Sequence, residues 1–346
     1  MTFANNTPFA AEAIPFFAPD GREVVLVIMK ATFARVERRA LRAETQMPVR
    51  LTDVPHLPEE TGFAPNGPFL RAPDGDRGPP VEVSLKYASD VCTSKRGMDV
   101  VLVAEAVSVK RTLAADVAIS LGAKKLTLRV HGERVYDRAI GKLSFGPAAA
   151  FERRPLVWEL AYGGTSDDFS AVERHNPVGR GVASGELAGR PAPCIEDPAA
   201  PLVPGSASAP VGVGAIATSW LPRSKHAGTY DTAWHEHRMP LSPADYDVRA
   251  GNVAAPALVL EQPLAPGELC ATMGLVPEGL WSFDVPRLAF TVRARTADGR
   301  ALKATPTPDT LLLEPAKDRI ELVARVVFPM GRGKSLLREV QVDHDG

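Results

Sequence analysis

The sequence predicts a mainly β protein, in which antiparallel sheets form one or two β-sandwich-like units with long Gly/Pro-rich connections and little helix. Several short segments alternate apolar and polar side chains with a period of two, which is typical of strands. The 28 glycines and 32 prolines among 346 residues indicate many turns. No stretch longer than about 15 residues has the spacing of an amphipathic helix.

The strand candidates of the first half begin with Val24–Val36, whose β-branched and aromatic residues favour a buried strand. Asp99–Val109 is the second candidate. Val117–Leu121 and Leu126–Val130 alternate cleanly on either side of a short turn, which predicts an antiparallel hairpin. The stretch Thr52–Pro80 is rich in proline and glycine and lacks periodicity, so we expect a long surface loop there.

The middle of the chain has weaker signals. We interpret Leu156–Tyr162 as a further strand, whereas residues 166–214 contain no convincing element. Ser242–Pro243 precedes a segment that fits a turn or two of helix, since proline is favoured at the first helical position. The last third adds four strand candidates, namely Leu269–Leu275, Leu288–Arg295, Thr310–Glu314 and Arg319–Phe328.

We expect a domain boundary near residues 148–155, where a Pro-Ala-Ala-Ala run interrupts the strand pattern. The predicted units are an N-terminal β unit over residues 1–150, which includes the long loop at 52–80, and a motif-rich loop with a C-terminal β unit over residues 151–330. Residues 331–346 are expected to form a polar tail.

Charge and composition exclude several classes of function. The formal net charge is −1, so the overall positive charge of a nucleic-acid or anionic-membrane binder is missing. The longest apolar run, Val24–Met29, is far shorter than the roughly 20 residues that span a bilayer. Three widely spaced cysteines and a start without a secretory signal favour a cytoplasmic protein.

Known catalytic motifs are absent or poorly placed. Gly333–Ser335 resembles the end of a phosphate loop but lacks its first glycine, and the Gly179-x-Gly181 pair has no clear βαβ unit around it. Cys194 lies among prolines and alanines with no cation close in the sequence, so we expect a packed thiol rather than a nucleophile. We therefore predict no enzymatic activity and no cofactor.

A weak metal-binding alternative rests on His226, Asp231, His235 and His237. In a strand, His235 and His237 would point to the same side, and two imidazoles with a carboxylate are typical zinc ligands. The alternative function would be a metal-dependent hydrolase.

The middle of the chain also carries dense polar and aromatic motifs in a fixed order. They are Trp158–Gly164, Asn176–Gly181, Cys194–Pro198, Trp220–Arg223, Ala227–Asp231, Trp234 and Arg238–Pro240. Taken with Lys95–Leu102, Lys125–Arg134 and Asp247–Pro256, this series resembles the bacterial family catalogued as domain of unknown function 2169. The resemblance covers about residues 15–330.

The resemblance implies an association with type VI secretion. Members of the family are similar to cytoplasmic adaptors or chaperones, which help load secreted effectors onto a spike that includes a valine-glycine-repeat protein and a PAAR-type tip. We therefore expect an effector or a spike protein as partner, with no nucleic acid and no membrane insertion. The resemblance brings no catalytic residues.

Ten residues of these motifs have two possible roles. As an exposed surface of aromatic and arginine side chains, they would form a protein-binding hot spot. As buried residues, they would hold the long loops on the sheet through side-chain hydrogen bonds. The candidates are Trp158, Tyr162, Asn176, Arg180, Trp220, Arg223, Tyr230, Asp231, Trp234 and Arg238.

A third possibility is a carbohydrate- or ligand-binding β-sandwich, with Trp220, Tyr230 and Trp234 as a stacking platform. This possibility requires the three rings to be exposed on one surface.

Overall fold

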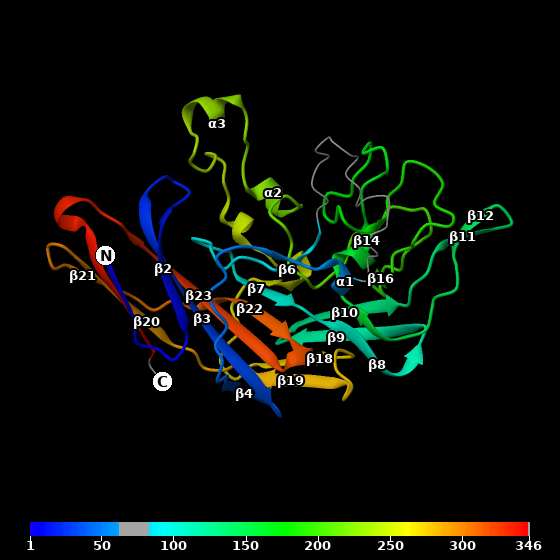
Figure 1. Cartoon of the computed structure of the whole chain (residues 1–346), viewed down its shortest axis with the longest axis horizontal. Helices are drawn as coiled ribbons and strands as arrows, with labels where there is room; N and C mark the ends of the chain where they lie inside the picture. The colour runs from blue at the N-terminus through cyan, green and yellow to red at the C-terminus, as the bar shows by residue number, and fades with distance from the viewer. Residues whose placement is uncertain (62–82, 345–346) are drawn as a thin grey trace.

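The computed structural model describes residues 1–61 and 83–344. Its architecture confirms the prediction of a mainly β protein with little helix, because its strands form one large curled sheet and several smaller sheets (Figure 1). The strands form where apolar and polar side chains alternate along the chain, and the short helices lie in the loops between strands.

The large sheet contains strands from both halves of the chain. Its strand order is β16 (Ile195–Glu196), β10 (Lys124–His131), β9 (Ala114–Leu121), β18 (Leu269–Met273), β19 (Leu280–Asp284), β4 (Arg39–Arg42), β3 (Glu23–Val36), β23 (Arg319–Pro329), β22 (Pro308–Glu314), β7 (Met98–Leu102) and β17 (Val259–Leu260). β2 (Ala10–Phe17) pairs with β3 as well, beside β4.

The centre of this sheet is the antiparallel pair of β3 and β23, whose register runs from Val24 opposite Pro329 to Ala34 opposite Arg319. The apolar run at the start of β3 is fully buried on both faces of the strand, as its near-continuous hydrophobic sequence predicts. Lys30 interrupts this run and is itself fully buried.

A four-stranded sheet lies at one end of the molecule, in the order β1 (Thr2–Asn5), β24 (Leu337–His344), β20 (Phe290–Thr296) and β21 (Ala301–Ala304) (Figure 1). The Phe9 ring joins it to the large sheet, with ring centroids 5.8 Å from Phe33 of β3 and 5.9 Å from Phe290 of β20. Residues 331–346, which we predicted to be a polar tail, instead contain β24, with its alternate apolar side chains buried.

The remaining strands form two-stranded sheets, and the helices are short. The pairs are β8 (Glu105–Thr112) with β13 (Phe151–Pro155), β11 (Tyr136–Ala139) with β12 (Lys142–Phe145), β5 (Val54–Pro55) with β6 (Leu85–Tyr87), and β14 (Tyr162–Gly163) with β15 (Arg180–Gly181). The α-helices are α1 (Pro58–Thr61), α2 (Arg223–His226) and α3 (Thr232–His237). The 3₁₀ turns are η1 (Trp158–Leu160), η2 (Val248–Gly251), η3 (Pro256–Leu258), η4 (Pro315–Lys317) and η5 (Gly333–Ser335).

Most strand predictions are confirmed, and two are wrong in detail. Asp99–Val109 is not one strand, because the chain leaves β7 at Leu102 and starts β8 at Glu105. Leu156–Tyr162 is not a strand either, since its centre folds into η1, in which Trp158, Glu159 and Leu160 are all buried. A short apolar run does not distinguish a strand from a buried helical turn.

The long loop and the domain boundary predicted from the sequence are not decided by the structure. Of the loop predicted over Thr52–Pro80, residues 52–61 contain β5 and α1, and the rest lies outside the described residues. The boundary near residues 148–155 stays a prediction, although strands from both sides of it pair within the large sheet. Within residues 1–61 and 83–344, none of the helices has the length and apolar character needed to cross a membrane.

Candidate functional site: a buried loop core and an exposed arm

The ten candidate residues divide into two groups by burial. Six lie in the interior, where they contact the long loops, namely Trp158, Tyr162, Asn176, Arg180, Trp220 and Arg223. The other four, Tyr230, Asp231, Trp234 and Arg238, lie on a separate excursion of the chain that is exposed or half-buried.

Asn176 is the centre of the buried group. Its side chain is fully buried, and its Nδ2 donates hydrogen bonds to the carbonyl oxygens of Trp158, at 2.8 Å, and Tyr162, at 2.9 Å. Trp158 is the first residue of η1, and its carbonyl oxygen also accepts from Ala161 N at 3.1 Å, whereas Tyr162 begins β14. Asn176 therefore holds the loop that follows β14 against η1.

The two tryptophans of this group pack on one another in a T-shaped arrangement, with ring centroids 6.1 Å apart and an interplanar angle of 85°. Trp158 Nε1 donates to the carbonyl oxygen of Ala215 at 3.1 Å. Trp220 is fully enclosed by the chain. A stacking platform that uses Trp220 together with Tyr230 and Trp234 is therefore not formed.

Arg223 also acts on backbone, because its Nη1 and Nε donate to the carbonyl oxygens of Ile216, at 2.6 Å, and Ala250, at 3.0 Å. Burial lowers the pKa of this guanidinium from its usual value, although nearby carboxylates oppose the change. The side chain joins the start of α2 to η2 and to the loop before α2. The six side chains are thus buried among the loops, as the loop-holding interpretation of these residues requires.

The exposed group lies on a segment that we call the α3 arm, residues 226–247. It begins and ends at one point, where Asp247 N donates to the carbonyl oxygen of His226 at 2.9 Å. In Figure 1 the arm stands above the sheets, with α3 at its tip. Asp231 is the N-cap of α3, since its Oδ1 accepts from Trp234 N at 2.8 Å.

Internal contacts give the arm a defined shape. The Tyr230 and Trp234 rings pack edge to face with centroids 4.7 Å apart, and Trp234 Nε1 donates to the carbonyl oxygen of Leu241 at 2.8 Å. Asp245 accepts from Thr229 N at 2.9 Å and from Thr229 Oγ1 at 2.8 Å. These two hydrogen bonds lower the pKa of the Asp245 carboxyl.

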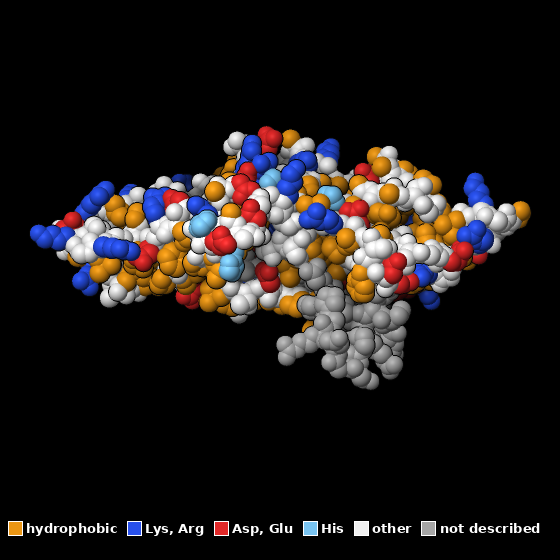
Figure 2. All heavy atoms as spheres, turned by 90° about the horizontal axis from the view of Figure 1, so that it is seen from above, with side chains coloured by type: hydrophobic (Ala, Val, Ile, Leu, Met, Phe, Trp, Pro, Cys, Tyr) orange, Lys and Arg blue, Asp and Glu red, His pale blue; other side chains and the backbone are white. Residues whose placement is uncertain are grey.

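The arm also contacts the turn between β2 and β3, through Leu241. Leu241 lies so close to Gly21 that a Cβ at that glycine would come within 2.7 Å of Leu241 Cδ1. Toward solvent, the arm leaves Tyr230 58% and Met239 57% exposed. Figure 2 looks down on this face, where apolar, basic and acidic side chains are interspersed. The arm is therefore an ordered projection with an aromatic, mixed-charge surface.

The metal-site prediction rested on a strand, and the segment is a helix instead. His235 and His237 are two residues apart in α3, so they point in very different directions. Asp231 is engaged as the helix cap. In the part of the chain that the structure describes, no three His, Cys, Asp or Glu side chains are placed to hold a metal ion. The residues His226, Asp231, His235 and His237 do not form a ligand set.

Cys194 is fully buried, which confirms the predicted packed thiol. The sequence neighbours of Cys194 include no cation, but the fold brings two arginine side chains close to its sulfur. Arg154 Nη2 lies 3.4 Å and Arg180 Nη1 3.9 Å from its sulfur, and Arg180 also pairs with Glu133 at 2.6 Å. These arginines come from β13 and β15, so their approach depends on tertiary structure.

The sequence prediction missed a buried ionic network on one face of the large sheet. Lys30 Nζ lies 2.9 Å from Asp90 Oδ2 and 3.1 Å from Glu321 Oε2. Arg50 binds both oxygens of Glu321, at 2.7 and 3.0 Å, and stacks over the Tyr87 ring at 4.2 Å. Burial raises the pKa of Glu321, but the hydrogen bonds from Arg50 and the charge of Lys30 outweigh it, so the pKa lies below its usual value.

A second ion pair extends this network to β7. Lys95 Nζ lies 2.6 Å from Asp99 Oδ2, and Asn252 Nδ2 donates to Asp99 Oδ1 at 3.0 Å. The backbone N–H of Val253 also donates to Asp99, at 2.9 Å. The cavity beside the network measures about 20 Å³, which accommodates one water molecule. The network therefore joins β3, β23 and β7 to the loops that cover them.

Comparison with protein families decides the assignment. Residues 20–325 match the family described as "Uncharacterized protein conserved in bacteria (DUF2169)". The chain belongs to this family. No curated protein and no solved structure matches the chain closely enough to add to the assignment.

The DUF2169 match covers the buried loop core, the ionic network and the whole α3 arm. It ends within β23, so β24 lies beyond the matched residues. The resemblance of the motifs is thus confirmed at the level of the family.

Proposed function

We propose that this DUF2169 protein is a non-enzymatic adaptor or chaperone of the cytoplasm. It binds a type VI secretion effector, or the PAAR-type tip that carries it, and helps load the cargo onto the valine-glycine-repeat spike. The observation that carries the proposal is the α3 arm, an ordered projection in which Tyr230 and Met239 are exposed to solvent while Trp234 and Arg238 are half-buried beside them.

The composition and stiffness of the arm support a role in protein binding. Tyrosine, tryptophan and arginine dominate the hot spots of protein interfaces, and the arm contains Tyr230, Trp234 and Arg238. The Asp231 cap, the hydrogen bond from Trp234 Nε1 and the anchor of Leu241 fix the arm before a partner arrives. A preformed surface loses less conformational entropy on binding, which favours affinity.

The test is co-expression with the effector encoded beside this gene, followed by affinity purification of the pair. The proposal expects a stable complex and an effector that is less soluble when the adaptor is absent. If the pair never co-purifies, and if deletion of the gene leaves effector solubility and delivery unchanged, the proposal is wrong.

Surface variants locate the contact. Tyr230→Ala and Met239→Ala remove the two most exposed large apolar side chains of the arm, so each should weaken the complex by about tenfold or more, or about 1.4 kcal/mol. Met239→Ala should leave the melting temperature unchanged. Phe169→Ala is the matched control, because Phe169 is 65% exposed on a different loop. Equal loss of binding in the control would place the contact elsewhere.

A further inference from the structure

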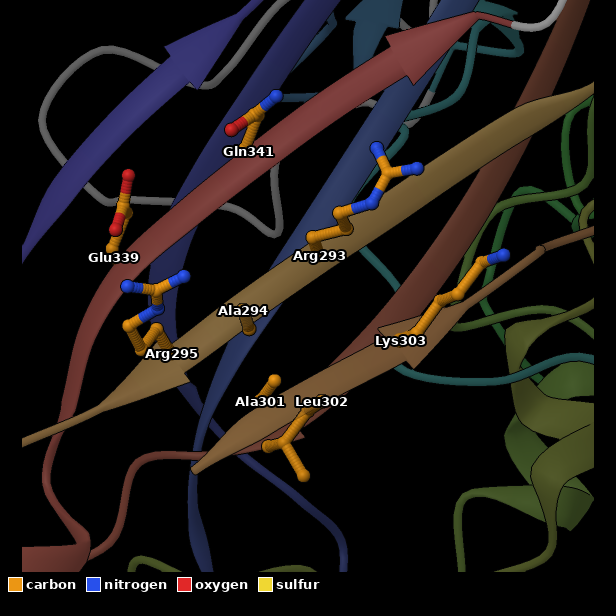
Figure 3. A pocket seen from close by; sticks show the side chains of 8 residues that line it. All are labelled: Arg293, Ala294, Arg295, Ala301, Leu302, Lys303, Glu339 and Gln341. Atoms are coloured by element: carbon orange, nitrogen blue, oxygen red, sulfur yellow. The ribbon is translucent and has the colours of Figure 1, made fainter. Parts of the chain in front are cut away.

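A groove of about 270 Å³ lies across three strands of the four-stranded sheet, beside its β21 edge, and is separate from the α3 arm (Figure 3). Three neighbouring strands contribute its walls. Glu339 and Gln341 come from β24, Arg293 and Arg295 from β20, and Lys303 from β21, together with nearby alanine and leucine side chains. β21 is the outermost strand and pairs only with β20 among the described residues.

The hydrogen-bond pattern shows which backbone groups of β21 are free. Thr296 N donates to the carbonyl oxygen of Arg300 at 3.0 Å at the start of the hairpin. In an antiparallel pair the bonded positions alternate, so Leu302 and Ala304 face β20 with their N–H and C=O groups. Ala301 and Lys303 therefore point the same groups away from the sheet, at the spacing that an added strand requires.

The side chains along this edge are mainly cationic. Arg293 lies directly opposite Lys303, an arrangement of like charges that weakens strand pairing. Arg293 is paired with Asp343 of β24. Across residues 1–61 and 83–344, no carboxylate lies within ion-pairing distance of Arg295 or Lys303. Glu339 is the one acidic side chain among the residues that line the groove.

We propose that the β21 edge binds an extended, acidic segment of a protein partner, which adds to the sheet as a fifth strand. Backbone hydrogen bonds to Ala301 and Lys303 would hold the segment, and alternate carboxylates would meet Arg295 and Lys303. A second copy of this chain is disfavoured, because edge-to-edge pairing would set the cationic edges of both copies, with Lys303 on each, side by side. The acidic strand relieves the like-charge contact within the hairpin.

This inference does not depend on the α3 arm, and its test uses the purified protein alone. The probe is a fluorescein-labelled peptide of four Val-Glu repeats, measured by fluorescence anisotropy at low and moderate salt. Binding is expected for this peptide and not for four Val-Lys repeats. A version with N-methyl groups on alternate residues keeps every charge but loses backbone donors, so it should bind at least about tenfold more weakly.

Protein variants distinguish the contribution of side-chain charge to peptide binding from that of backbone hydrogen bonds. Lys303→Glu and Arg295→Glu should each raise the dissociation constant by at least about tenfold. Ala301→Pro keeps all charges and removes an N–H that faces solvent, so it should preserve the hairpin yet weaken binding to a similar extent. Lys142→Glu, at an exposed position of β12, is the matched control and should bind as the parent does.

Several results would overturn the proposal. Equal binding of the N-methylated and unmodified peptides would show that the peptide binds by charge attraction alone, without backbone hydrogen bonds to β21. Anionic phospholipid vesicles that bind the parent and Ala301→Pro equally, while the peptide does not bind, would assign the surface to a membrane. A dimer of the free protein that Ala301→Pro abolishes would assign it to a second copy. A failed pull-down of the effector with intact peptide binding would refute the proposed adaptor function and leave this inference standing.

Discussion

Replacing Glu321 by glutamine tests whether the buried ionic network stabilises the fold. Glu321 is fully buried and accepts two hydrogen bonds from Arg50, while Lys30 lies 3.1 Å away. The amide keeps the shape of the side chain but turns an NH₂ group toward cationic donors. Removing one partner of a buried ion pair costs about 3–5 kcal/mol, because the remaining charges stay buried without compensation.

The size of the chain converts this loss into a shift of melting temperature. At about 2.1 cal/mol/K per residue, the 346 residues have an unfolding entropy of about 0.7 kcal/mol/K, so the shift should be about 4–7 °C. Calorimetry of parent and variant at pH 7 measures it. Glu152→Gln is the control, since Glu152 is exposed on β13, and its melting temperature should change by less than about 1 °C.

The pH dependence gives an independent check. The pKa of Glu321 is lowered in the folded state, so the stability it contributes is present above its unfolded pKa of about 4.3 and is lost as the pH falls through the lower folded value. The difference between parent and Glu321→Gln should be constant above about pH 5 and should shrink below about pH 4. A variant as stable as the parent at pH 7, or a difference that grows in acid, would refute the reasoning.

Three further predictions concern the buried residues. Trp220→Ala should cost about 3–5 kcal/mol in urea denaturation, because the ring is fully enclosed, and a cost near zero would contradict its place in the core. Asn176→Ala removes one hydrogen bond from each of the carbonyl oxygens of Trp158 and Tyr162, so it should cost about 2–4 kcal/mol in the same assay, well above an exposed alanine substitution. Burial raises the pKa of the Cys270 thiol to about 12, so native protein at pH 8 should leave Cys270 unlabelled by a thiol reagent, as mapped by mass spectrometry, until it is unfolded.

The strands could be predicted wherever the local sequence has a clear pattern, either a strict period of two or a long apolar, β-branched run. The hairpin of Val117–Leu121 and Leu126–Val130 has a strict period of two around a turn, and it forms β9 and β10. Val24–Val36 has a long apolar and β-branched run, and it forms β3. The 3₁₀ turn at Trp158 was missed, because a short apolar run does not distinguish a strand from a buried turn, and the Asn176 side chain that bonds to this turn comes from a later loop.

The site was only partly predictable, because aromatic and arginine side chains serve both cores and interfaces. Composition does not distinguish the enclosed Trp220 from the half-buried Trp234, and only tertiary structure separates them. Two local signals were available and were not used. Asp231 three residues before Trp234 fits an N-cap, and Lys30 inside an apolar run indicates a buried ion pair.

The four-stranded sheet has a consequence for how the protein is made. Thr2 of β1 lies opposite Glu339 of β24, and β24 also separates β1 from β20. During translation β1 and β20 are synthesised before residues 337–344. Until β24 is present, the Phe290 side chain, which is buried in the folded protein, lacks the strand that lies beside it. A chain that stops before residue 337 would present that open face and two unsatisfied edges to chaperones and proteases, so the folding of the four-stranded sheet depends on β24.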